Sequence, residues 1–234
     1  MGPGQLRDFL TQLRQNADFE QQSSKIAVRR RRIRRQRYVV RIDLLGMKPP
    51  VWRRLAVASD LTMDQFHVII QDAFGWEFAH LHCFGLWSPD RGTYCDQLLT
   101  RYDIEYEQKT GLAESDVQLN QVLTKPGSKV SYEYDFGDGW HHMVKLEQVT
   151  DWVPGDPLAQ CLTGRRACPP EDCGGPYGFE EFLREAAARD WDTEEPQDEW
   201  EWQMAEFDPA EFNLEDINDR LQFEADHGFI GQGM

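Results

Sequence analysis

Hydrophobic and polar residues alternate in several short stretches of the chain, as they do in strands that bury one face. Residues 38–45 alternate in this way, residues 51–57 read as an antiparallel partner, and residues 81–87 give a third strand. Before the third strand, apolar residues recur at helical spacing from Phe66 to Phe74, and Gly75 is suited to end this helix. The pattern therefore predicts strand, strand, helix and strand, in that order.

Two further alternating runs, in residues 130–149, flank the sequence Asp-Phe-Gly-Asp-Gly. Its glycines and its Asp-Gly pair favour a tight hairpin turn. With the earlier elements, this hairpin predicts an α+β fold: a mixed or antiparallel sheet, a packed helix and a β-grasp-like order, followed by C-terminal helices. We expect the turn to gather side chains into a surface for a ligand or partner. These side chains are Asp135, Asp138, Trp140, His141 and His142.

The rest of the chain divides by composition. Residues 154–176 are rich in Pro and Gly and read as a loop, and residues 179–188 predict a helix with one apolar face. Residues 190–206 are acidic and aromatic, and residues 209–223 contain the last apolar positions that could pack. We expect an appendage at 1–37, a single domain at 38–223 that is helical and acidic from 180 onward, and a tail at 224–234.

The appendage begins with apolar residues at helical spacing from Leu6 to Leu13 and ends in a block of arginines. Seven of the nine residues from 29 to 37 are arginine, and such a block can bind the phosphates of a nucleic acid. Two alternatives stay open: pairing with the acidic C-terminal region, or a solvated lead-in to the first strand. The arginines are Arg29, Arg30, Arg31, Arg32, Arg34, Arg35 and Arg37.

Composition narrows the class of protein. The hydrophobic content of 40% is that of a folded chain, whereas the net charge of −16 argues against nucleic-acid binding by the molecule as a whole. The acidic C-terminal region is instead suited to a basic protein partner. No apolar run is long enough to span a bilayer and no signal peptide is evident, which predicts a cytoplasmic protein without a membrane partner.

Three cysteines in residues 161–173 form the main metal signal. The intervals of six and four residues differ from the tight spacing of most structural zinc sites, but Cys161, Cys168 and Cys173 could bind zinc with His142 as fourth ligand. Alternatively, the cysteines pack beneath the loop, because free cysteine is commonly buried. A nucleophilic role for Cys173 is the least favoured interpretation.

Two other groups of residues carry metal-binding chemistry. His80 and His82 are two residues apart, so on a strand they would share one side and offer a second site or a ligand surface. An acidic set could bind a hard divalent cation, as in metal-dependent hydrolases and nucleases, together with His141 and His142. A turn-stabilising role explains part of this set equally well. The set is Asp135, Asp138, Glu171 and Asp172.

Several motifs resemble the signatures of the plasmid pRiA4b ORF-3-like family. They are YDFGDGWHH at 134–142, GRRACPPEDCGGPYG at 164–178, PVWRR at 50–54, Gly75-Trp76 with HLH at 80–82, and FDP at 207–209. The resemblance covers residues 38–223 and implies a compact α+β domain encoded on plasmids and transposable elements, with some members labelled transposon passengers or resolvase-like. The sequence shows no recombinase constellation. We therefore predict a non-enzymatic accessory or adaptor protein, with a metal-dependent hydrolase as the alternative.

Overall fold

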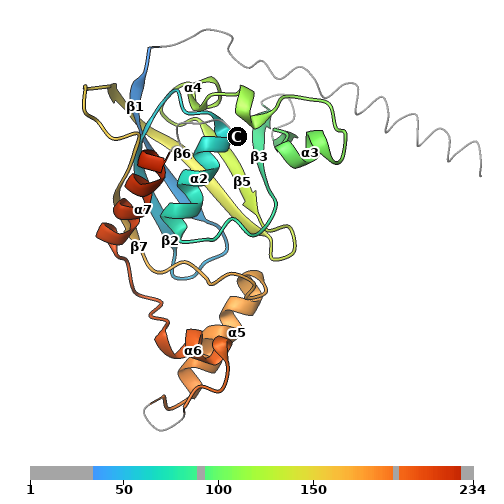
Figure 1. The fold of residues 1–234 in the computed structure, drawn as a ribbon, viewed down its shortest axis with the longest axis vertical. Helices are drawn as coiled ribbons and strands as arrows, with labels where there is room; N and C mark the ends of the chain where they lie inside the picture. Colours follow the sequence, from blue (N-terminus) through green and yellow to red (C-terminus); the bar gives the residue numbers. More distant parts are fainter. Residues whose placement is uncertain (1–33, 89–92, 192–194, 228–234) are drawn as a thin grey trace, which may run out of the picture.

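The computed structural model describes residues 34–88, 93–191 and 195–227. Within them, an antiparallel sheet of seven strands has the order β4-β3-β5-β6-β1-β2-β7 (Figure 1). The strands are β1 (Gln36–Leu44), β2 (Val51–Ala58), β3 (His82–Ser88), β4 (Thr93–Gln97), β5 (Lys129–Tyr134), β6 (Trp140–Asp151) and β7 (Ala159–Arg165). The predicted α+β class and the order strand, strand, helix, strand and hairpin are confirmed.

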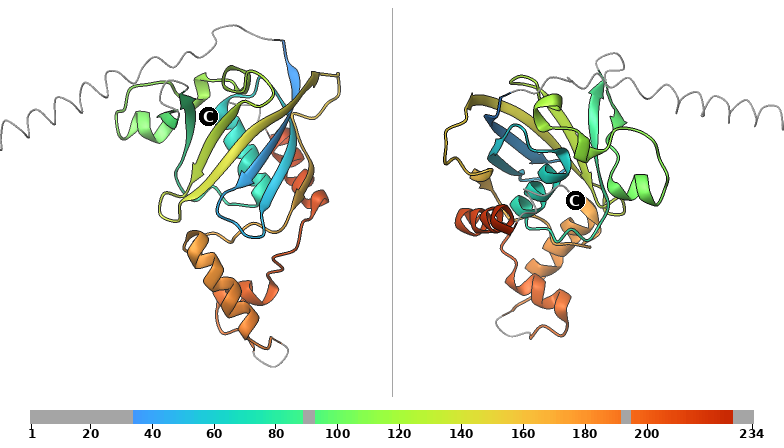
Figure 2. Two further views of the ribbon diagram at one scale, coloured as in Figure 1. Left: turned by 180° about the vertical axis from the view of Figure 1, so that it is seen from behind. Right: turned by 45° about the horizontal axis from the view of Figure 1, so that its top comes forward.

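Helices cover one face of this sheet. The helices α2 (Met63–Phe74) and α7 (Leu214–His227) lie across it, whereas the other face, seen from behind in Figure 2, carries no described helix. The remaining helical segments are α3 (Arg101–Glu105), η1 (Glu114–Asp116), α4 (Leu119–Val122), α5 (Gly175–Ala188) and α6 (Glu199–Glu206). Among the described residues, no helix has the length and apolar character that crossing a bilayer requires.

The core lies between α2 and the sheet. In β1 the alternate residues Tyr38, Val40 and Ile42 are buried, as their period of two predicts. Thr62 and Gln65 form a capping box at the start of α2, and Gly75 ends the helix in the left-handed conformation with φ +85°. Full burial of each large apolar side chain contributes about 1.5–3 kcal/mol, which makes this layer the main source of stability.

Two predicted boundaries differ from the structure. The prediction of one loop over residues 154–176 is wrong, because Cys161 lies on β7, which pairs with β2. Cys161 lies opposite Leu55 of β2. The sequence of β7 shows little strand pattern, and its pairing with β2 stabilises the strand instead. The first strand also begins at Gln36, so Arg37 belongs to the sheet and not to the appendage.

Four connections meet at one end of the sheet: residues 45–50, 75–81, 135–139 and 166–174. Backbone hydrogen bonds join them, from the Leu45 amide to the His141 carbonyl at 2.8 Å and from the Asp135 amide to the Leu81 carbonyl at 2.9 Å. The helices α5 and α6 lie beyond this end (Figure 1). Loops held on a rigid sheet are a common setting for binding residues, which directs attention to this end.

Candidate metal centre

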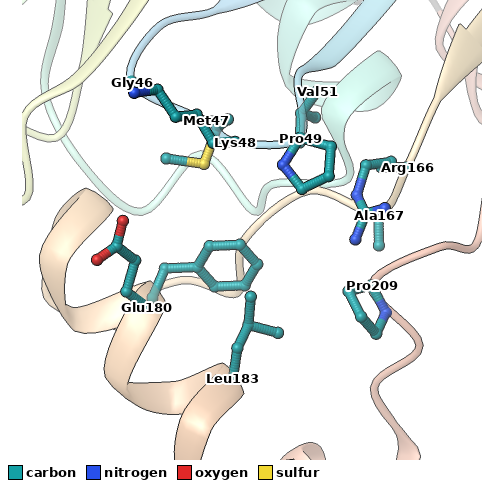
Figure 3. Close-up of a pocket in the computed structure, with 11 residues that line it drawn as sticks. Gly46, Met47, Lys48, Pro49, Val51, Arg166, Ala167, Glu180, Leu183 and Pro209 are labelled. Carbon is teal, nitrogen blue, oxygen red and sulfur yellow. The ribbon is translucent and has the colours of Figure 1, made fainter.

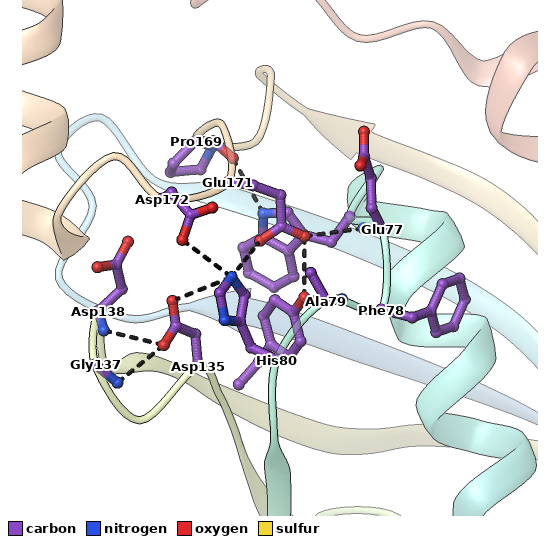
Figure 4. Close-up of polar contacts among 12 residues, drawn as sticks. Glu77, Phe78, Ala79, His80, Asp135, Gly137, Asp138, Pro169, Glu171 and Asp172 are labelled. Carbon is purple, nitrogen blue, oxygen red and sulfur yellow. Dashed lines mark hydrogen bonds and ion pairs between the residues drawn. The ribbon is translucent and has the colours of Figure 1, made fainter.

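One imidazole nitrogen at the loop end of the sheet faces three carboxylates (Figure 4). The Nε2 atom of His80 lies 3.1 Å from Asp172 Oδ1, 3.7 Å from Asp135 Oδ2 and 3.7 Å from Glu171 Oε2. These residues come from three connections: His80 precedes β3, Asp135 follows β5, and the other two precede α5. We call these four residues the His80 centre.

Two of the carboxylates are each held by one oxygen, while the other oxygen faces His80. Asp135 Oδ1 accepts hydrogen bonds from the amides of Gly137 and Asp138 at 2.9 and 3.3 Å. Glu171 Oε1 accepts from the Glu77 amide at 2.9 Å and from the Tyr134 hydroxyl at 3.0 Å. Glu171 Oε2 is buried and has no hydrogen-bond partner among the described residues. Outer contacts of this kind orient carboxylates that bind metals.

The backbone around the centre adopts conformations that L-residues seldom take. Phe78, Asp135 and Asp172 have φ of 61°, 53° and 55°, in the left-handed region. Aspartate tolerates this region better than most residues because its short side chain can bond locally, whereas a phenylalanine there is a true exception. Such residues collect where the surrounding structure fixes a functional geometry.

An aromatic base supports the centre. The rings of Trp76 and Tyr134 stack with centroids 5.0 Å apart, and the His80 ring meets Tyr134 edge-on at 5.8 Å. Trp76 Nε1 donates to the Pro169 carbonyl at 3.1 Å, which ties the 166–174 loop to the same base. The Tyr134 hydroxyl also accepts from the Ala79 amide at 3.1 Å. The three connections are thus held in one arrangement.

The ligand atoms of His80, Asp135 and Asp172 lie close enough together to hold a divalent cation. Ligands bound at about 2.1 Å to one ion lie about 3.0–3.4 Å apart, close to the separations at Nε2. In the described part of the chain, His80, Asp135 and Asp172 are the one group of three or more His, Cys, Asp or Glu whose ligand atoms all lie within 4.8 Å of one another. A protonated His80 would balance only one of the three carboxylates. A divalent ion with nitrogen and oxygen ligands balances two, and both Zn²⁺ and Mn²⁺ accept such ligands.

Several residues expected at the hairpin surface lie elsewhere. Trp140 is fully buried in the core and cannot form a ligand surface. His82 stacks on His67 at 3.5 Å and contacts Glu114 at 3.1 Å, away from His80, because His80 precedes the strand on which the two were expected to share a side. The His141 side chain is 60% exposed and lies 3.8 Å from Glu133.

The cysteine set expected to bind zinc with His142 does not come together. No group of three ligands that includes Cys161, Cys168 or Cys173 meets the same distance limit among the described residues. His142 is fully buried against Phe74, with its Nδ1 atom 3.1 Å from the Trp140 carbonyl. Burial lowers its pKa to about 3, so the ring is neutral and acts as a packing element.

Burial also governs the thiols. It raises the pKa of Cys161 to about 11 and that of Cys173 to about 12, and it raises the pKa of Cys168 well above its ordinary value. These thiols are therefore protonated at neutral pH, which disfavours a nucleophilic role for Cys173. Cys161 is instead part of the packing of β7, and Asn218 of α7 bonds both its backbone amide and its carbonyl.

Part of the arginine block can be placed. Residues 29–32 lie outside the described residues, and Arg34 is exposed. Arg35 donates to both carboxylate oxygens of Asp60 at 2.7 and 3.0 Å. Arg37 bonds Asp156 and Gln160, each at 2.9 Å. Two of the seven arginines therefore already have partners within the chain.

The centre combines residues that sequence reasoning had placed in separate groups. Asp135, Glu171 and Asp172 were expected in an acidic set with His141 and His142, whereas His80 was paired with His82. Asp138 joins no ligand group and instead accepts from the Gly174 amide at 3.0 Å. The missing signal was topological: connections at one end of an antiparallel sheet lie close together, however far apart they are in sequence.

Comparisons with known proteins agree with this fold. Residues 36–216 match the family described as plasmid pRiA4b ORF-3-like protein. The uncharacterized protein y4hQ of Sinorhizobium fredii is 30% identical over 181 residues, which are 76% of this chain and 87% of that protein. The crystal structure of a protein of unknown function, MM3350 from Methanosarcina mazei Go1, is similar with a TM-score of 0.62 and 30% identity, covering 78% of this chain and 97% of that one.

The family match includes every strand of the sheet and all four residues of the His80 centre. The chain therefore belongs to the plasmid pRiA4b ORF-3-like family.

Proposed function

We propose that this protein is a divalent-metal-binding accessory protein whose working site is the His80 centre. The observation that carries the proposal is the convergence of three carboxylate oxygens on one imidazole nitrogen that has no hydrogen-bond partner among the described residues. The expected cofactor is zinc or manganese, bound by these four side chains and not by the cysteines.

Titration calorimetry on untagged, metal-stripped protein tests this function, with Zn²⁺, Mn²⁺ and Mg²⁺ in separate runs. We expect one Zn²⁺ or Mn²⁺ per chain and weak binding of Mg²⁺, which prefers oxygen ligands and retains its waters. The His80→Ala variant should bind at least about 100-fold more weakly, because it lacks the nitrogen ligand. The matched control is His141→Ala, an exposed histidine on the adjoining hairpin. Equal affinities in the two variants would rule the centre out.

A metal-dependent hydrolase is the second candidate, and one observation favours it. The Asp172 side chain is 75% exposed, so the centre opens to solvent and a bound ion could keep a water ligand. A divalent ion lowers the pKa of such a water toward neutrality and turns it into a nucleophile for phosphoesters. Mn²⁺-dependent cleavage of an aryl phosphodiester, lost in Asp172→Asn and retained in His141→Ala, would establish this activity. No cleavage with any of the three metals would reject it.

Nucleic-acid binding by the arginine block is a separate proposal. Because Arg35 and Arg37 already have carboxylate partners, residues 29–34 would supply most of the phosphate contacts. Five phosphate contacts give an affinity that falls steeply with salt, with a log–log slope of about −4.5 on duplex DNA. Deleting residues 1–33 should abolish a gel shift at low salt. An unchanged shift would exclude the block as the binding segment.

A further inference from the structure

The side of the sheet that carries no described helix is a broad surface that the His80 centre does not use (Figure 2). We call it the open face. By contrast, the hollow that α5 forms with the 45–50 connection has a volume of about 30 Å³, which is room for water but not for an organic ligand (Figure 3). Successive side chains of a strand point to opposite sides of a sheet, so the strand register shows which residues share the open face.

Four basic residues lie side by side on the open face, one on each of four adjacent strands. Arg54 of β2 lies opposite Arg41 of β1, which lies opposite Lys145 of β6. Lys145 in turn lies opposite Lys129 of β5. We call these four residues the basic row. Neighbouring strands are about 4.8 Å apart, so the row runs for roughly 14 Å across the strands.

Carboxylates compensate only half of the basic row. Its two arginines are paired with Asp43 and Glu147, each at 2.7 Å. Lys129 and Lys145 are exposed and form no ion pair with the described residues. Like charges that lie directly opposite each other destabilise a sheet, so an anion bound along the row would relieve this repulsion. In a chain with a net charge of −16, this local excess of positive charge indicates a surface for an anionic ligand.

An aromatic side chain adjoins the basic row. Trp52 lies two residues before Arg54 on β2, and therefore also on the open face. The guanidinium carbon of Arg41 lies 4.2 Å from the centroid of the Trp52 ring, and that of Arg54 lies 5.6 Å from it. Unpaired bases stack both on aromatic rings and on guanidinium planes, as they do on the sheets of single-strand-binding domains. The open face thus combines ion-pairing and stacking groups within one surface.

We infer that the open face binds single-stranded nucleic acid, with phosphates along the basic row and a base against Trp52. Phosphates repeat along a strand, so one ligand contacts several cations of the row at once. Continuity with the arginine block favours a nucleic acid over an acidic protein, because Arg37 of that block lies on the open face four residues before Arg41. The inference is independent of the metal centre, and it shares its ligand with the arginine-block proposal.

Fluorescence anisotropy with a labelled oligothymidylate of about 20 nucleotides tests the inference in the full chain. The double variant Lys129→Gln/Lys145→Gln should bind at least about tenfold more weakly. Its log–log salt slope should be shallower by about 1.4, because each phosphate contact on a single strand contributes about 0.7. The matched control is Lys48→Gln/Arg184→Gln, which removes two exposed charges outside the open face and should leave the slope unchanged.

Trp52→Leu tests the stacking contact separately. It should weaken oligothymidylate binding about tenfold without changing the salt slope, because it removes a stacking surface and no ion pair. Binding of a duplex of the same length should stay unchanged, since paired bases are stacked on each other. Trp52→Phe, which keeps an aromatic ring, should restore most of the affinity. Circular dichroism checks that each variant is folded.

The outcomes separate this inference from the arginine-block proposal. If the double lysine variant keeps the affinity and slope of the unmodified chain while deletion of residues 1–33 abolishes binding, the inference is overturned and the arginine-block proposal stands. If neither change weakens binding, both are overturned. Equal losses of oligothymidylate and duplex binding in Trp52→Leu would overturn the assignment to single strands. Competition by polyglutamate as strong as that by unlabelled oligothymidylate would overturn it as well, and would assign the open face to acidic proteins.

Discussion

Two histidines show how the surroundings decide what an imidazole can do. His80 lies among connections at the end of the sheet, where its Nε2 atom faces three carboxylates, two of which are anchored by their other oxygens. His142 lies on β6, which β5 separates from β3, and it packs in the core against Phe74, Trp76 and Tyr132. Both are near residues with metal-binding chemistry. The comparison shows that histidine can serve as a metal ligand only where other ligand atoms lie close to it. In an apolar layer, a histidine such as His142 packs as part of the core.

The largest expected effect tests the core side of this comparison. Trp140→Ala should lower the free energy of unfolding by about 3–5 kcal/mol, because it removes a fully buried aromatic side chain and leaves a cavity. Urea denaturation followed by circular dichroism measures the loss. Phe136→Ala, a change at an exposed aromatic residue of the same hairpin, is the control and should cost far less. Similar costs for the two variants would show that Trp140 is not the core residue described here.

A buried carboxylate that lies outside any metal group gives a smaller effect. Burial, followed by the nearby Glu224, raises the pKa of Asp72 from 3.8 to about 7, against the opposing effect of Arg220. The folded protein therefore holds this proton more tightly than the unfolded chain between those two pH values. The free energy of unfolding therefore falls as the pH rises from about 4 to about 7. Above pH 7 the folded protein bears the full cost of burying the ionised Asp72 carboxylate.

Asp72→Asn removes this cost and should raise the free energy of unfolding by about 1–2 kcal/mol at pH 8, with a smaller gain at pH 5. Denaturation at the two pH values measures the difference. The matched control is Asp64→Asn, in the first turn of the same helix, where the negative charge instead favours the helix. Equal gains at both pH values would mean that Asp72 keeps its ordinary pKa in the folded protein.

The smallest expected effect is that of a cysteine substitution on metal binding, and it distinguishes the His80 centre from the cysteines. Cys161→Ser should leave the Zn²⁺ stoichiometry and affinity unchanged, while it lowers the free energy of unfolding by about 1–2 kcal/mol through burial of a hydroxyl. Metal analysis by plasma mass spectrometry, together with calorimetry, checks the first part. Loss of one bound Zn²⁺ per chain would reverse the comparison and assign the metal to the cysteines.

Much of the fold followed from local pattern. The alternation in residues 38–44, the helix ending at Gly75 and the Asp-Gly turn each depend on neighbouring residues, and all three are present. The strand β7 was missed because its seven residues lie between Pro- and Gly-rich segments and are stabilised by pairing with β2. Residues 180–223 were expected to be helical, but the separate bounds of α6 did not follow from the sequence, since this helix is stabilised by packing on α5.

The site was only partly predictable. The Asp-Phe-Gly-Asp-Gly turn indicated Asp135, because an aspartate that bonds its own turn is a local feature. The direction of His80 depends on a left-handed Phe78 two residues earlier, a conformation that no sequence rule assigns to phenylalanine. The approach of Glu171 depends on its bond from Tyr134, which is 37 positions away in the chain. Such contacts exist only once the sheet has formed.

Charge is divided unevenly between two segments of the chain. Residues 175–206, which carry α5 and α6, contain eleven Asp and Glu against two Arg, whereas seven arginines in residues 29–37 lead into β1. The start of β1 lies at the opposite end of the sheet from α5 and α6 (Figure 1). We therefore expect a polyanion to be attracted to the segment before β1 and a cationic protein to the helices α5 and α6, with encounter rates that fall as the ionic strength rises.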